Sequence, residues 1–122
     1  MYKFSFENLT VWQDARLIVS DIYKDTKEFP DTEKFGLTNQ IRRSAVSVSS
    51  NIAEGSSRSS NKEQAHFYTM AYSSSIELMS QLILAFDLGY INEDKLLKYR
   101  AEIEKIANKL NSLKKAVLKG SR

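Results

Sequence analysis

The chain has 122 residues, of which 42% are hydrophobic and 27% charged, and its formal net charge is +3. This composition is typical of one folded domain over residues 1–122 and excludes a disordered chain, while the absence of cysteine excludes disulfides and thiolate metal sites. No stretch reaches the roughly 20 apolar residues of a membrane span, and the first ten residues lack a signal-peptide pattern, so we expect a cytoplasmic protein.

The first two helices are expected over residues 10–29 and 33–54. Thr10 and Gln13 have the spacing of a capping box, and Pro30 disfavours helix in the residue before it. Gly55 is expected to end the second helix in the left-handed conformation. The apolar face of the second helix consists of Leu37, Ile41, Ala45, Val48 and Ile52.

A third helix is expected over residues 61–88, with a capping box at Ser60 and Glu63 and a stop at Gly89. Between residues 65 and 88 its only charged side chains are Glu77 and Asp87. Such a helix is apolar or small nearly all round, which indicates burial on more than one side. One small bundle cannot cover it completely, so we expect self-association.

A fourth helix is expected over residues 93–119, with Asn92 as its N-cap. Most of its lysines lie opposite its apolar face, and Lys114 alone points toward that face. No segment alternates with period two, and the connections between helices are short. The predicted fold is therefore all-α, an antiparallel up-down-up-down four-helix bundle that forms oligomers.

The serine-rich segment 44–60 holds eight serines but follows helical periodicity as far as Gly55. Its small side chains favour close packing against the third helix. One stripe of the second helix is polar and has two interpretations, a solvated face or a buried hydrogen-bond network joined by Glu77, with Arg43 as its first candidate partner. The stripe consists of Gln40, Arg43, Ser47, Ser50, Asn51 and Glu54.

Charge is distributed unevenly along the chain. Residues 1–33 carry a net charge of −3, residues 34–122 carry +6, and no acid follows Glu104. A basic end of this kind is either a solvated helix end that suits the macrodipole or a surface for an anionic partner such as nucleic acid. The candidate nucleic-acid-binding residues are Arg58, Lys62, Lys98, Lys105, Lys109, Lys115, Lys119 and Arg122.

Enzymatic chemistry finds little support in the sequence. The serine-rich segment lacks the glycines of a phosphate-binding loop and has no nearby base for a serine nucleophile. The single histidine, His66, excludes a di-iron site built from two Glu-x-x-His pairs within one chain. Arg58 and His66 approach the pattern of metal-independent nuclease bundles, but the seven residues between them exceed its spacing. We therefore expect no catalytic residues, no metal and no cofactor.

Several segments resemble a known family. FENLTVWQDA near the start, FPDTEKFGLTNQIRRSAVSVSSNIAEG in the middle, and then SSSIEL and LGYI are similar to proteins encoded in intervening sequences of bacterial 23S rRNA genes. These proteins, often labelled ribosomal-protein-like, are also similar to the accessory protein of diversity-generating retroelements. By position, the resemblance singles out Gln40, Arg43, Ser47, Asn51, Glu54, Gly55 and Glu77.

The resemblance implies a non-enzymatic homopentamer that binds nucleic acid, with RNA as the first candidate. An alternative is a protein-interaction scaffold, for example a partner of a reverse transcriptase or another nucleic-acid-processing protein. A third hypothesis is the metal-independent ribonuclease.

Overall fold

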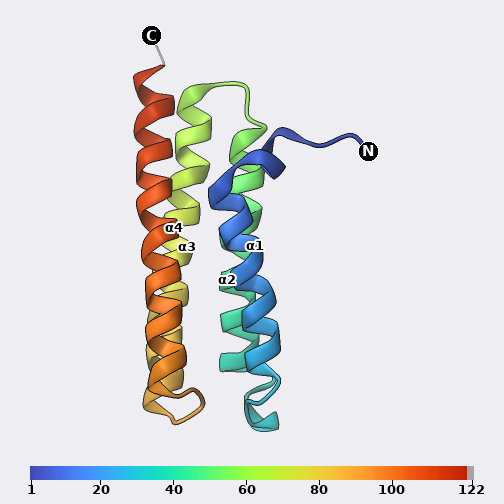
Figure 1. Ribbon diagram of the computed structural model, residues 1–122, viewed down its shortest axis with the longest axis vertical. Helices are drawn as coiled ribbons and strands as arrows, with labels where there is room; N and C mark the ends of the chain where they lie inside the picture. Colours follow the sequence, from blue (N-terminus) through green and yellow to red (C-terminus); the bar gives the residue numbers. More distant parts are fainter. Residues whose placement is uncertain (121–122) are drawn as a thin grey trace.

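The computed structural model describes residues 1–120, and within them all regular structure is helical. Four long helices lie side by side along the long axis of the molecule (Figure 1). They are α1 (Thr10–Thr26), α2 (Leu37–Ser56), α3 (Asn61–Asp87) and α4 (Glu93–Lys119). Two short 3-10 helices precede α1 and α2, namely η1 (Ser5–Asn8) and η2 (Asp31–Glu33). The α2–α3 connection lies at one end of the molecule, and the other two connections lie at the opposite end (Figure 1).

The apolar stripes read from the sequence form the core. Helix α3 packs extensively against both α2 and α4, whereas α1 covers α2 and contacts α4 less. Burying these side chains contributes roughly 1.5–3 kcal/mol for each large aliphatic group. The most deeply buried of them are Ile18, Ile22, Ile41, Ile52, Leu78, Leu82, Ile106 and Leu110.

The predicted start of the first helix at Thr10 is confirmed, but its expected capping box and its expected end are wrong. The N-cap of α1 is Leu9, which makes no side-chain cap, so Thr10 and Gln13 do not form a capping box. The Gln13 amide instead donates to the backbone oxygen of Glu7 at 2.8 Å, because η1 folds back over the start of α1. The helix ends at Thr26 and not near residue 29. The turn that follows it brings Phe29 into the core, where this ring is buried.

The second helix also differs from its predicted bounds. It begins at Leu37, after η2, and the Glu33 carboxylate accepts a hydrogen bond from the Leu37 N–H at 3.2 Å. It then continues through Gly55 to Ser56. Among the described residues only Gly89 has a positive φ, so Gly55 is not the left-handed stop that the sequence suggests.

The predicted N-caps of α3 and α4 are confirmed, but the capping box at Ser60 and Glu63 is only half formed, because the Glu63 carboxylate accepts from the Ser60 hydroxyl and not from the Ser60 N–H. The Ser60 hydroxyl accepts a hydrogen bond from the Glu63 N–H, and the Asn92 side chain accepts one from the Lys95 N–H. Gly89 follows the C-cap of α3 and has a φ of 81°. The Tyr90 N–H donates a hydrogen bond to the carbonyl oxygen of Ala85. This bonding pattern is the Schellman motif, which satisfies carbonyl groups that the end of a helix leaves without partners.

Candidate functional site

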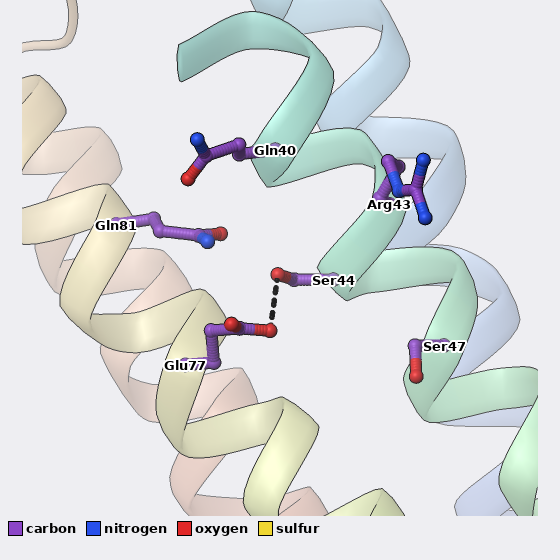
Figure 2. A pocket seen from close by; sticks show the side chains of 6 residues that line it. All are labelled: Gln40, Arg43, Ser44, Ser47, Glu77 and Gln81. Atoms are coloured by element: carbon purple, nitrogen blue, oxygen red, sulfur yellow. Dashed lines mark hydrogen bonds between the residues drawn. The ribbon is translucent and has the colours of Figure 1, made fainter. Parts of the chain in front are cut away.

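The predicted polar stripe of α2 lies along the edge of its interface with α3. The Ser44 hydroxyl donates to the Glu77 carboxylate at 2.9 Å (Figure 2), and the hydroxyls of Ser47 and Ser74 lie 2.9 Å apart. The Asn51 amide donates to the backbone oxygen and the hydroxyl of Ser47. The structure thus brings Ser47, Asn51 and Glu77 to one seam between the two helices.

The expectation of a buried Glu77 bound to Arg43 is wrong. Glu77 is exposed in this chain, and its hydrogen-bond partner is Ser44. Arg43 is exposed too, and its side chain extends away from Glu77 (Figure 2). The reason is geometric, because Ser44 and not Arg43 occupies the α2 position that faces α3 at this level.

A polar cleft of about 330 Å³ opens along this seam. Ser44, Gln81 and Gln40 point into the gap between α2 and α3 (Figure 2). Gln81 is only 8% exposed, and its side-chain oxygen has no hydrogen-bond partner within residues 1–120. A buried polar atom without a partner costs roughly 1–3 kcal/mol, so this oxygen requires an explanation. The residues that line the cleft are Gln40, Arg43, Ser44, Ser47, Glu77 and Gln81.

Gly55 and Glu54 lie at the far end of the same stripe. A methyl group at Gly55 would come within 2.8 Å of Tyr68 Cε1 and 2.9 Å of Phe67 Cβ. The glycine therefore permits a close approach of α2 to α3. Glu54 is exposed and forms an ion pair with Arg58 at 3.6 Å.

Three predicted nucleic-acid-binding lysines of α4 have partners on α1. Lys109 binds the Asp14 carboxylate at 2.6 Å, and Lys105 lies 3.7 Å from it. Lys98 lies 4.0 Å from Asp21. The acids of the negative N-terminal segment thus offset much of the positive charge on this side of α4.

Among the other predicted cations, Lys62 lies in the first turn of α3, and Lys115 and Lys119 lie in the last two turns of α4. The start of α3 and the end of α4 lie at the same end of the molecule (Figure 1). These two helix ends are neighbours, because a methyl group added at Gly120 would lie 3.8 Å from the Asn61 amide nitrogen. Lys62, Lys115 and Lys119 are exposed, and none has an ion pair within residues 1–120. Arg58 stacks over the Phe67 ring at 4.4 Å besides pairing with Glu54. Arg122 lies outside the described residues.

A separate polar cluster joins α1 to α4 near the opposite end of the molecule. Asp25 accepts a hydrogen bond from the Tyr99 hydroxyl at 2.5 Å and pairs with Lys95 at 3.0 Å. Burial alone would raise the pKa of Asp25, but the bonds from Tyr99 and Lys95 outweigh it and lower that pKa. Burial and the same carboxylate raise the pKa of Tyr99. This cluster fixes the position of α1 against α4.

The family of the chain follows from comparison with known proteins. A family model described as the 23S rRNA-intervening sequence protein matches residues 7–112. The chain belongs to this family. A solved structure of a protein of unknown function, from the S23 ribosomal protein family of Bacteroides thetaiotaomicron VPI-5482, superposes with a TM-score of 0.60 at 20% identity. The match covers 92% of this chain and 98% of that one, and at this identity it shows the fold alone. No curated protein sequence matches.

The structure places two features at the candidate sites that the sequence analysis did not identify, a buried glutamine and the ion pairs between α1 and α4. Gln81 stands among apolar residues of α3, and no local sequence pattern predicts that a glutamine side chain is buried. Asp14 and Asp21 stand two helical turns apart on α1, as Lys98 and Lys105 do on α4. Matching these two spacings between helices would have identified the ion pairs.

The residues considered for catalysis do not gather into a site. His66 is exposed, and its ring lies 5.9 Å from that of Phe67. Glu63 hydrogen-bonds with Ser60 at the start of α3. No group of three or more His, Asp or Glu side chains that could hold a metal occurs within residues 1–120, and no helix there could span a membrane.

Proposed function

We propose that this protein is a non-enzymatic, cytoplasmic homo-oligomer that binds RNA or another nucleic acid through one end of its bundle. Five subunits are favoured, as the family resemblance implies. The observation that carries the proposal is the group of exposed cations Lys62, Lys115 and Lys119 where α3 begins and α4 ends. Ammonium groups free of carboxylate partners are available to phosphates, and each contact made releases counterions.

The ion pairs between α4 and α1 reduce the number of lysines that are fully available to bind nucleic acid. Asp14 already neutralises part of the charge of Lys105 and Lys109, so these two lysines contribute less to phosphate binding than unpaired lysines do. Phosphate contacts position a protein on nucleic acid without reading its sequence. The proposal is therefore binding with little sequence preference, strengthened when several subunits present the same end to one strand.

Self-association is supported by the exposed side of α3. Ile76 and Leu84 of α3, and Leu88 at its C-cap, are each about half exposed, at 49%, 50% and 57%. Apolar side chains grouped on one helix are typical of a surface that another protein covers. The same proposal takes the subunit as an antiparallel up-down-up-down bundle, which is supported by the contacts of α3 with α2 and α4 and by the short connections.

The test is salt-dependent binding of a labelled single-stranded RNA, followed by fluorescence anisotropy. Reversing Lys62, Lys115 and Lys119 to glutamate should lower the slope of log affinity against log salt by about 2, since each contact contributes about 0.7 for single strands. The matched control reverses three exposed lysines near the opposite end, Lys24, Lys27 and Lys34, with the same change in net charge.

Nucleic-acid binding through this end is refuted if the wild type does not bind RNA at low salt. It is also refuted if the two triple variants lose affinity equally, because the effect would then reflect net charge alone. The absence of RNA cleavage by the wild type, and no change in His66→Ala, would support the non-enzymatic assignment.

The exposed apolar residues of α3 also favour a second candidate, a scaffold that binds a nucleic-acid-processing protein such as a reverse transcriptase. A pull-down from the native cells separates the two candidates. A protein partner that remains bound after nuclease treatment supports the scaffold, whereas a partner that is lost supports binding through nucleic acid.

A further inference from the structure

The cleft between α2 and α3 holds an unusual set of hydrogen-bond acceptors. The Gln81 side-chain oxygen is buried and has no partner within residues 1–120. Glu77 lies four residues earlier on α3, so both side chains lie on the same face of the helix. The Ser44 hydroxyl engages one Glu77 oxygen, and none of the described residues donates a hydrogen bond to the other. The cleft thus presents a carboxylate beside an amide oxygen.

The charge and polarity of the groups that face the cleft favour a cationic ligand. Glu77 repels an anion, and Arg43, which also lines the cleft, extends away from Glu77 and forms no ion pair with it (Figure 2). An apolar group would leave the Gln81 oxygen without a partner and would also desolvate the carboxylate. A positively charged group with several N–H donors satisfies both acceptors at once.

We propose that the α2–α3 cleft binds an ammonium or guanidinium group, which donates hydrogen bonds to the Gln81 oxygen and the Glu77 carboxylate. A volume of about 330 Å³ accommodates such a group with part of its aliphatic chain. The group belongs either to a small free amine or to a lysine or arginine of a second copy of this chain. Neither source requires that the protein bind nucleic acid, so the outcomes of the two proposals are independent.

The first experiment titrates the full-length protein with propylammonium and with methylguanidinium, at constant ionic strength, and follows the amide signals of the cleft by NMR. Tetramethylammonium is the control ligand, because it carries the charge but no N–H donor. Glu77→Gln and Gln81→Leu should each weaken binding about tenfold, the effect of losing a charge-assisted hydrogen bond. Asp87→Asn removes an exposed acid elsewhere on α3 and should leave binding unchanged.

The second experiment identifies the source of the cationic group by measuring molar mass with light scattering. If a neighbouring copy supplies the group, Glu77→Gln and Gln81→Leu lower the mass, Asp87→Asn does not, and the small probes compete with assembly. If a free amine is the ligand, the probes bind and the mass does not change. Circular dichroism of each variant confirms that it is folded.

Two results would overturn the proposal. One is that the probes do not bind and that neither Glu77→Gln nor Gln81→Leu lowers the mass. The other is that tetramethylammonium binds as tightly as propylammonium, because the acceptors of the cleft would then make no hydrogen bonds to the ligand.

Discussion

Replacing Gly55 with alanine tests whether the close approach of α2 to α3 sets the geometry of the cleft. Helix propensity alone favours alanine by about 1 kcal/mol at this position within α2. The added methyl would lie 2.8 Å from Tyr68 Cε1, well inside the roughly 3.5–4.0 Å of a normal carbon–carbon contact. Tyr68 is only 3% exposed, so its ring cannot move aside into solvent.

Overpacking of this kind costs about 1–3 kcal/mol, which exceeds or offsets the gain in propensity. We expect a net loss of about 1 kcal/mol, which corresponds to a fall in melting temperature of about 3–5 °C for a chain of this length. The assay is thermal unfolding followed by circular dichroism, at fixed protomer concentration because assembly would shift the midpoint.

Asparagine at the same position distinguishes packing from backbone strain. Asparagine tolerates the left-handed conformation better than alanine does, but it is larger. Gly55→Asn should therefore be less stable than Gly55→Ala, whereas at Gly89, which has a φ of 81° and open space around it, the order should reverse. If Gly55→Asn were as stable as Gly55→Ala, the close-approach explanation would be wrong.

The remaining predictions concern charge and polarity. Asp14→Asn should lower the free energy of unfolding by about 1 kcal/mol, because it weakens the hydrogen bond from Lys109, and thermal unfolding measures this loss. Under the proposed function, the same substitution should increase the affinity for RNA, which fluorescence anisotropy measures. The folded pKa of Asp25 lies below its unfolded value of 3.8, so its stabilisation is present above about pH 4 and is lost as the pH falls further; Asp25→Asn should remove this part of acid unfolding. The folded pKa of Tyr99 lies above its unfolded value of 10.0, so its contribution is complete below pH 10.0 and is lost as the pH rises; Tyr99→Phe should reduce alkaline destabilisation. Gln81→Leu should stabilise the ligand-free protein by about 1–2 kcal/mol, because it removes a buried acceptor without a partner, and denaturant titration measures this gain.

Local signals predicted the limits of α3 and α4 well because each acts within one turn of the chain, although the capping box expected at Thr10 and Gln13 does not form. Ser60 and Asn92 cap their own helices, and Gly89 takes the positive φ that its position after α3 suggests. The apolar period of α2 likewise identified its buried face. These features depend on hydrogen bonds and spacings that the sequence displays directly.

Signals that depend on a second helix were misread. Gly55 resembles a helix stop in isolation, but its small size is required by Tyr68 on α3. The lysines of α4 resemble an open basic face until Asp14 on α1 is placed beside Lys109. In both cases the partner lies far along the chain, so one helix considered alone could not reveal it.

The polar stripe of α2 also depends on a second helix, because α3 supplies the partners of its side chains at the seam. Most of the stripe is exposed, as a solvated face predicts, whereas Ser47 and Asn51 are partly buried and hydrogen-bonded at the seam with α3. Ser44 and Ser47 are engaged by Glu77 and Ser74, whereas the neighbouring Gln81 oxygen is buried without a partner. An isolated subunit loses stability by burying that acceptor, unless another group completes its hydrogen bonding. Under the proposal above, a cationic group completes the hydrogen bonding of this acceptor, and the seam is then a binding site and not a finished part of the core.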